Sequence, residues 1–125
     1  MKVKLDMVGI VVKDMRAALD FYRVLGFNIS NDLNDEPHAE VNQDGVRLAF
    51  DTQEIARSVY GSWDEPTGHR VELAFLCESS EEVDRVYRLV TEEGYEGHKE
   101  PWDAVWGQRY AIVKDPDGNL ISFFA

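Results

Sequence analysis

The sequence contains an internal repeat, and this repeat constrains the fold before any motif is considered. Residues 7–25 read MVGIVVKDMRAALDFYRVL, and residues 72–90 read ELAFLCESSEEVDRVYRLV. Each stretch holds a short apolar segment, a polar break and a helical pattern, with Tyr22 and Tyr87 at the same place. Later, an Asp-Gly pair leads into VRLAF in the first half and into NLISFF in the second. Self-similarity of this kind predicts two copies of one supersecondary unit.

The length favours one compact domain, since the chain has 125 residues. A half of about 60 residues buries too little surface to be more than marginally stable alone. We therefore expect the two halves to share a core or to pair with a second chain.

Charge and cysteine content exclude several classes of protein. The net charge of −11 argues against nucleic acid as a partner, because phosphates require a basic face. The acidity either serves solubility or indicates a cleft that attracts a cationic ligand. Cys77 is the single cysteine, and we expect it to pack in the core. With no internal disulfide, no signal-like N-terminus and no long apolar run, we expect a cytoplasmic location without membrane contact.

The first half predicts a βαβββ plan. Asp14 can cap a helix that carries an apolar stripe and ends at Gly26. Asp44-Gly45 is a strong hairpin signal. We expect strands over residues 2–12, 27–33, 39–43 and 46–51.

The second half predicts the same plan after a bridge that holds a short helix near residues 55–60. Ser79 and Glu82 form a capping box, and Gly94 ends the helix that follows. Asp115-Pro116-Asp117-Gly118 predicts a tight turn. We expect strands over residues 70–77, 95–99, 108–114 and 120–124.

The motifs VVKDMRAALDFYRVLGF and WGQRYAIVKDPDGNLISFF, with the duplicated plan, resemble the vicinal oxygen chelate superfamily. This group includes glyoxalase I, bleomycin-resistance proteins, fosfomycin-resistance enzymes and extradiol dioxygenases; the second motif resembles bleomycin-resistance-type, metal-free members. The resemblance covers the whole chain. It implies an α+β fold in which a single domain, residues 1–125, consists of two βαβββ modules. The modules, about residues 1–52 and 69–125 linked by 53–68, form a curled mixed sheet with a concave cup and helices on its outer face. It also implies a homodimer.

The resemblance also implies where a metal would bind, namely on the first and last strands of each repeat. Those positions hold Met7, Ala49, Glu72 and Ser122 in this chain. A thioether, a methyl group and a neutral hydroxyl are poor ligands for the divalent ions of such sites. We therefore expect no metal and no other cofactor.

Three histidines are alternative ligand candidates. His38, His69 and His98 stand at predicted strand ends beside turn residues. The odd spacing from His69 to Glu72 puts the two side chains on opposite faces of a strand. We expect surface or supporting roles for all three, with a place at the pocket edge as the alternative.

Strand parity predicts the wall of the cup. With Met7 inside, the alternating neighbours Val8, Ile10 and Val12 face the helices. The inward set is small and mainly apolar, which suits an organic ligand. Its members are Met7, Gly9, Val11, Arg47, Ala49, Asp51, Glu72, Ala74, Leu76, Leu120, Ser122 and Phe124.

An aromatic group adds to this wall. Trp63, Trp102, Trp106 and Tyr110 lie mostly in loops or at strand starts. They either cover the core or a dimer contact, or they stack on a flat or cationic ligand. In proteins that this chain resembles, the loop equivalent to PWDAVWG borders the cleft, which carries over to Trp102 and Trp106.

Glu72 is the one ionisable group at the predicted centre. As a buried carboxylate it could act as a general base, hold a ligand ammonium, or form a salt bridge with Arg47 or Arg109. These alternatives remain open at this point.

The sequence therefore predicts a non-enzymatic protein that sequesters a small amphipathic or cationic molecule, such as an antibiotic. The alternatives are a metal-dependent lyase or transferase of glyoxalase type, and a metal-free lyase or isomerase with Glu72 as base. The predicted ligand-binding residues are Met7, Arg47, Ala49, Glu72, Trp102, Trp106, Tyr110, Ser122 and Phe124.

Overall fold

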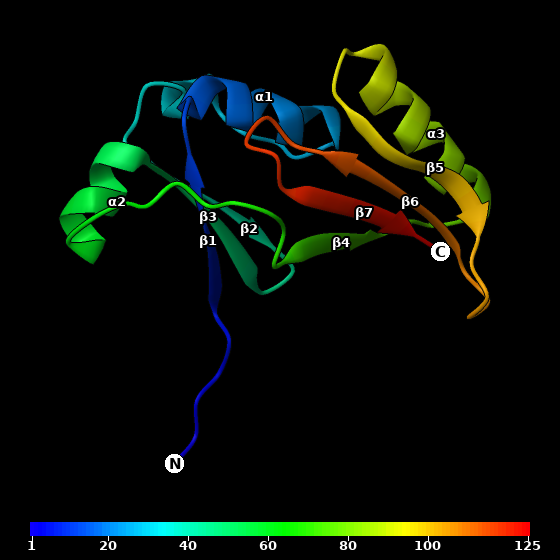
Figure 1. Ribbon diagram of the computed structural model, residues 1–125, viewed down its shortest axis with the longest axis horizontal. Coiled ribbons are helices and arrows are strands. Elements are labelled where there is room, and N and C mark those ends of the chain that lie inside the picture. The colour runs from blue at the N-terminus through cyan, green and yellow to red at the C-terminus, as the bar shows by residue number, and fades with distance from the viewer. The chain divides into compact units, whose positions relative to one another are not determined.

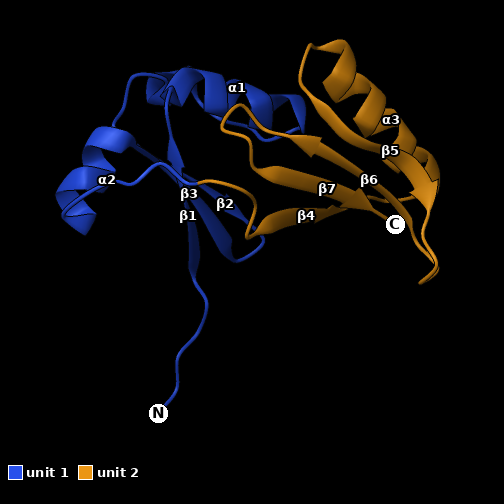
Figure 2. Cartoon of the chain, viewed as in Figure 1, with its two compact units in different colours: residues 1–66 blue, residues 67–125 orange.

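The structure, a computed structural model, describes all 125 residues. The chain divides into two compact units, unit 1 with residues 1–66 and unit 2 with residues 67–125 (Figure 2). Each unit is α+β and has its own mixed sheet (Figure 1). The boundary between them falls inside the predicted link of residues 53–68. None of the helices is long and apolar enough to cross a membrane.

Unit 1 contains a three-stranded sheet in the order β1-β3-β2. Strand β1 runs parallel to β3, and β2 runs antiparallel to it. The elements in chain order are β1 (Met7–Val12), α1 (Met15–Val24), the 3-10 helix η1 (Asn31–Leu33), β2 (His38–Gln43), β3 (Val46–Thr52) and α2 (Gln53–Tyr60).

Local chemistry explains where these elements begin and end. The Asp14 carboxylate accepts a hydrogen bond from the Ala17 amide at 3.0 Å, which confirms the predicted cap of α1. Asp44 and Gly45 both adopt left-handed backbone angles, with φ of 50° and 89°. Two such residues form the tight turn whose twist matches that of paired strands, so the predicted hairpin is confirmed.

The strand predicted over residues 27–33 is wrong. Ser30 instead caps η1, and the Arg23 guanidinium donates to the carbonyl oxygens of Ile29 and Ser30 at 3.1 and 3.0 Å. It also donates to Asn34 Oδ1 at 2.7 Å. These bonds satisfy backbone acceptors that a strand would give to a neighbouring strand. Unit 1 is therefore βαββ, and only unit 2 has the full βαβββ plan.

Unit 2 contains a four-stranded sheet in the order β4-β7-β6-β5. Strand β4 is parallel to β7, and the remaining pairs are antiparallel. The elements are β4 (Glu72–Leu76), α3 (Ser80–Glu92), β5 (Gly97–Asp103), β6 (Arg109–Lys114) and β7 (Leu120–Phe124).

The Ser79 cap and the turn of unit 2 follow the predictions, whereas the reciprocal half of the capping box does not form, because the Glu82 carboxylate binds Arg85. Ser79 Oγ accepts from the Glu82 amide at 3.1 Å and opens α3. In the turn between β6 and β7, Asp115 Oδ1 accepts from the amides of Asp117 and Asn119. This buried carboxylate fixes the hairpin from inside, which explains why the turn needs an Asp at its first position.

Helix α3 covers one face of the unit 2 sheet. Gly97 on β5 lies directly under the Tyr87 ring of α3, and an added methyl group there would overlap the Tyr87 hydroxyl. Gly97 pairs with Val113 of β6, so Val113 lies on the same face of the sheet as the contact with Tyr87. The residues of β6 and β7 on this face are buried. They are Ala111, Val113, Ile121 and Phe123.

The unit 1 sheet likewise buries one face. The Tyr22 ring of α1 contacts the Phe50 ring of β3, with centroids 5.0 Å apart. Phe50 pairs with Ile10, and Ile10 and Val12 are buried. The alternation predicted for β1 is therefore confirmed, and Met7 lies on the opposite face, paired with Arg47.

Candidate ligand-binding site

The face of the unit 2 sheet that points away from α3 carries the candidate site. Strand register places Phe124 beside Tyr110, and Ser122 beside Ile112. On the other side of β7, Ala74 pairs with Ser122 and Leu76 with Phe124. The predicted parity of these strands is therefore confirmed. We call this surface the open face of unit 2.

Glu72 is held in place by two hydroxyl groups. Ser122 Oγ donates to Glu72 Oε2 at 2.6 Å, and Tyr110 Oη donates to Glu72 Oε1 at 3.1 Å. Ser122 is fully buried, so its hydroxyl is a fixed donor. Hydrogen bonds to a carboxylate are stronger than neutral ones, and two of them fix the position of the Glu72 side chain.

The prediction that Glu72 is a buried carboxylate is wrong, because the residue is exposed at the start of the edge strand β4. Among the alternatives left open for Glu72, the salt bridge with Arg109 does not form, because Arg109 is bound to Asp84 and Asp103. In unit 1, Arg47 is bound to Asp6 and Glu40. Within unit 2, the negative charge of Glu72 is thus left without a salt bridge to a cation.

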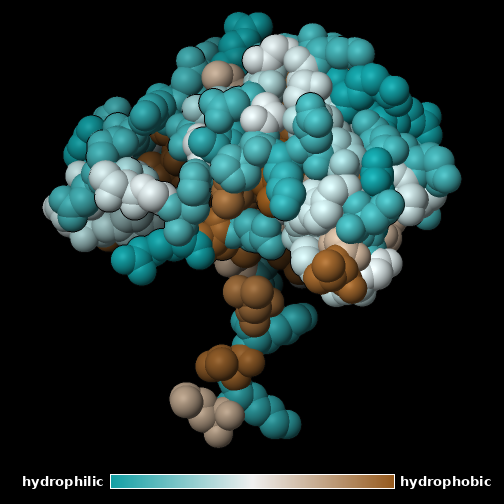
Figure 3. Space-filling view, turned by 45° about the vertical axis from the view of Figure 1, so that its right-hand side comes forward, coloured by the Kyte–Doolittle hydropathy of each residue, from teal (hydrophilic) through white to brown (hydrophobic).

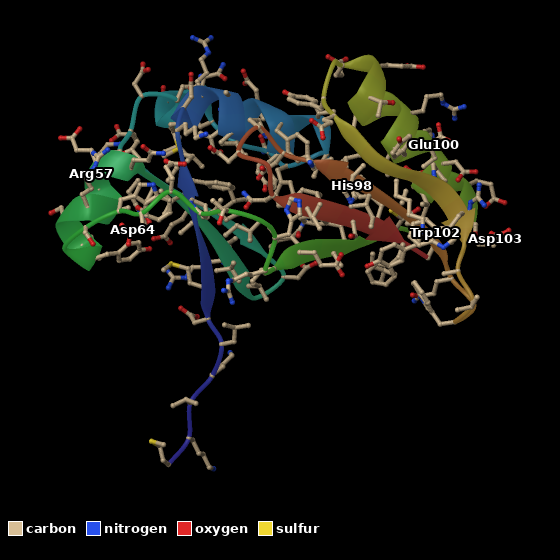
Figure 4. All side chains as sticks on the ribbon, viewed as in Figure 1. Arg57, Asp64, His98, Glu100, Trp102 and Asp103 are labelled. Carbon is tan, nitrogen blue, oxygen red and sulfur yellow. The ribbon has the colours of Figure 1, made fainter.

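Four aromatic rings continue the open face from Glu72 towards β5. Tyr110 stacks on Phe124 with centroids 6.0 Å apart and planes at 21°. Tyr110 also contacts Trp102 and Trp106 edge to face, at 5.4 and 5.5 Å. Trp102 projects from β5 (Figure 4), where it pairs with Tyr110. The tertiary structure therefore brings the four predicted aromatic residues of unit 2 together.

One cation of the chain already uses this aromatic surface. The Lys99 ammonium lies over the Trp102 ring, 3.9 Å from its centroid. A cation in this position is attracted by the negative face of the ring. The Trp106 indole N–H donates to Gln108 Oε1 at 2.8 Å, which fixes the position of the ring, and the Trp106 side chain is exposed. The cluster can therefore bind cations and flat apolar groups.

The environment of Tyr110 changes its acidity. Burial raises the pKa of the Tyr110 phenol, and the neighbouring Glu72 carboxylate raises this pKa further. The phenol therefore stays protonated and remains a donor to Glu72 across the physiological range.

The other predicted site residues belong to unit 1. Met7 is half-exposed, Ala49 is fully buried, and Arg47 is tied to Asp6 and Glu40, all on the face opposite α1. Trp63 lies in the segment after α2, where its indole N–H donates to Glu65 at 3.2 Å.

His38 takes part in a charge network that the sequence analysis missed. Its Nδ1 lies 2.5 Å from Asp51 Oδ1, and its Nε2 lies 2.8 Å from Glu40 Oε2. Hydrogen bonds with Glu40 and then Asp51 raise the pKa of the His38 imidazole. The two-residue spacing of His38 and Glu40 could have indicated this network, because it puts both side chains on one face of β2. Asp51, which pairs with His38, lies on the same face. His69 and His98 instead contact each other in unit 2, with ring centroids 6.1 Å apart.

The donors at the four family metal positions do not fit a divalent ion. Glu72 supplies the single carboxylate, and both of its oxygens accept from hydroxyl groups of the chain. No cluster of three or more His, Cys, Asp or Glu side chains is arranged to hold a metal ion. Thioether, methyl and hydroxyl groups do not compensate for missing imidazoles and carboxylates.

Comparison with known proteins places the chain in a family. The model of the glyoxalase/bleomycin resistance protein/dioxygenase superfamily matches residues 4–123. The chain belongs to this superfamily. Uncharacterized protein YraH of Bacillus subtilis, a similar protein, is 26% identical over an alignment of 125 positions, which covers 98% of each chain.

Solved structures of the superfamily share the fold. A glyoxalase/bleomycin resistance protein/dioxygenase family enzyme from Burkholderia phytofirmans has a TM-score of 0.86 and 22% identity, over 98% of each chain. A glyoxalase/bleomycin resistance protein/dioxygenase from Nocardioides has a TM-score of 0.79 and 26% identity, over 100% of this chain and 84% of the other. The predicted family and fold class are thus confirmed, while activities in this superfamily depend on site residues.

Proposed function

We propose that this protein binds a small cationic or amphipathic organic molecule on the open face of unit 2, without a metal. The observation that carries the proposal is the position of Glu72. Its carboxylate is exposed, fixed by Tyr110 and Ser122, and free of any salt bridge to a cation of the chain. An ammonium or guanidinium group of a ligand would supply the missing positive charge.

The aromatic rings beside Glu72 support the second part of the ligand. Trp102, Trp106 and Tyr110 offer ring edges and faces to a flat apolar group. Rings of this kind contribute a large apolar area, and they also attract cations. The preferred ligand therefore has a positive charge next to a planar aromatic system, as many antibiotics and other xenobiotics do.

The net charge of the chain supports the same class of ligand. At −11, the protein creates a negative potential that increases the local concentration of cations and speeds their association. Binding of this type sequesters the ligand and requires no chemical step. We propose this role, with resistance to a cationic antibiotic as its biological form.

A calorimetric titration tests the proposal. The panel contains bleomycin, 1-methylquinolinium as a flat cation and 2-naphthalenesulfonate as a flat anion of similar size. We expect heat with the cations and none with the anion, because the anion is repelled by Glu72. Binding of the anion with equal affinity, or no binding by any cation, contradicts the proposal.

A pair of charge-matched variants makes the test specific. Glu72→Gln removes the carboxylate and should weaken cation binding about tenfold, or ~1.4 kcal/mol. Glu92→Gln removes a charge from the exposed end of α3 and should leave the affinity unchanged. Equal losses in both variants would indicate a general charge effect and no defined site.

A further inference from the structure

Two histidines of unit 2 that are not among the four family metal positions contact each other. His69 lies shortly before β4, and His98 is the second residue of β5. Their ring centroids are 6.1 Å apart, and the ring planes are inclined by 67°. Both residues are exposed, so the pair is open to solvent and to small ions.

Backbone features direct both side chains to this contact. Gly68, with φ of 75°, turns the chain immediately before His69 through a left-handed conformation that side chains disfavour. In β5, a register shift between Gly97 and Lys99 makes two residues oppose one residue of β6. His98, labelled in Figure 4, is the extra residue of this β-bulge, a feature that changes the direction of a side chain. The turn and the bulge together bring the two rings into contact.

The ring nitrogens of this pair are not used within the chain. The structure gives His69 and His98 no hydrogen bond and no ion pair besides their contact with each other. The third histidine differs, because both ring nitrogens of His38 lie beside carboxylate oxygens, at 2.5 and 2.8 Å. Neutral imidazole is the commonest metal ligand in proteins. His69 and His98 therefore offer two available ligands at one place, whereas the nitrogens of His38 are engaged.

We propose that His69 and His98 together bind one divalent transition-metal ion, with Cu²⁺ bound most tightly. Imidazole suits copper, nickel and zinc, and Cu²⁺ has the highest affinity in the usual order of divalent ions. Each ring supplies one nitrogen, and water completes the coordination, since such ions take at least four ligands. A site with two protein ligands exchanges its ion readily. This ion is not part of the binding that we propose at Glu72.

The spacing of the rings is close to what an ion requires. A metal–nitrogen bond of about 2.0–2.1 Å, with tetrahedral or square-planar angles, holds the centroids of two imidazoles about 4.5–5 Å apart. The rings of His69 and His98 are 6.1 Å apart, so they must approach by roughly 1–1.5 Å. Rotation of two exposed side chains about their χ angles provides this movement, and the backbone keeps its position.

The charge of the chain favours a cation at this site. The net charge is −11, and hydrophilic residues cover most of the face of the molecule drawn in Figure 3. A negative potential increases the local concentration of divalent cations. The two neutral ligands then select among these cations, because imidazole prefers transition metals to Mg²⁺ and Ca²⁺.

A calorimetric titration of Cu²⁺ into the metal-free protein tests the inference, and it contains no organic ligand. We expect one tightly bound ion per chain. His69→Gln and His98→Gln should each weaken binding at least tenfold, because either substitution leaves a single imidazole. The double variant should lose little more than either single variant, since both residues hold the same ion. His38→Gln is the matched control and should keep the wild-type affinity. Circular dichroism checks that each variant is folded.

Electron paramagnetic resonance of bound Cu²⁺ counts the nitrogen ligands. The spectrum should show two nitrogens in the wild type and one in each single variant. Mn²⁺ should bind at least tenfold more weakly than Cu²⁺, as expected for imidazole ligands. Additive losses in the two single variants, a loss in His38→Gln as large as theirs, or a wild-type affinity no higher than that of the double variant overturns the inference.

Discussion

Ser122 and Glu72 lie on neighbouring parallel strands, and the Ser122 hydroxyl donates to the Glu72 carboxylate at 2.6 Å. The donor is completely buried, whereas the acceptor is at the exposed start of β4. The bond therefore connects the interior of unit 2 to the charge that we propose as the ligand anchor. Because the Ser122 hydroxyl is buried, it holds that charge in place.

Removal of this donor should lower both stability and affinity. In Ser122→Ala, Glu72 can turn to water, so the loss in the free energy of unfolding should be about 1 kcal/mol. Cation binding should weaken as well, since the carboxylate is no longer held beside the aromatic rings. Urea denaturation and calorimetry measure the two effects. The matched control is Ser58→Ala on the exposed side of α2, which should change neither. Unchanged affinity in Ser122→Ala would show that the bond does not position Glu72.

A side chain at Gly97 should force the Tyr87 ring to move. A methyl group at this residue would overlap the Tyr87 hydroxyl, so Gly97→Ala should destabilise the protein by about 1 kcal/mol. In the background of Tyr87→Phe, which lacks the overlapping oxygen, the same substitution should cost less. Gly9→Ala is the control, because no atom lies within 4 Å of the position of its added methyl group. Denaturation midpoints of the four variants measure the coupling, and additive effects would contradict the packing explanation.

The His38 network should make stability depend on pH. Hydrogen bonds with Glu40 and Asp51 raise the folded-state pKa of His38 above its ordinary value of 6.5. Protonated His38 therefore contributes stability that is fully present below about pH 6.5 and is lost as the pH rises through the higher folded-state pKa. The side chain is 42% exposed, so solvent screening keeps the effect small.

Paired denaturation curves at several pH values measure this contribution. The free energy of unfolding of the wild type should fall relative to that of His38→Gln as the pH rises above 6.5. His98→Gln is the control, since His98 lies outside the network. A constant difference between wild type and His38→Gln across this range would contradict the prediction.

Lys99 should compete with a cationic ligand for the Trp102 ring. Lys99→Met removes the ammonium that lies over this ring and keeps the aliphatic chain. A cation–π contact at an exposed site is worth about 0.5–1 kcal/mol, so affinity for 1-methylquinolinium should rise about two- to fivefold. Lys13→Met removes the same charge from unit 1 and should have a smaller effect. An equal gain in affinity in both variants would indicate an effect of net charge and not of removing Lys99 from the Trp102 ring.

Much of the local structure could be predicted from sequence because it depends on neighbours in the chain. The caps at Asp14 and Ser79 and the Asp44-Gly45 hairpin involve residues only a few positions apart. The alternation of strand faces was predictable for the same reason, since successive side chains point to opposite sides. The strand expected over residues 27–33 does not form, because the Arg23 guanidinium donates hydrogen bonds to the carbonyl oxygens of Ile29 and Ser30. No local sequence pattern predicts this contact.

The sequence by itself determined the repeat, the caps and turns, the family and the face of the sheet on which Glu72 and Ser122 lie. Only the tertiary structure decided which groups meet on that face. Tyr110 reaches Glu72 across 38 positions of the chain, whereas Arg109, one alternative partner of Glu72, is held by Asp84 and Asp103. The physical reason is that hydrogen bonds and ion pairs act over a few ångströms, and the register of distant strands sets which side chains come that close.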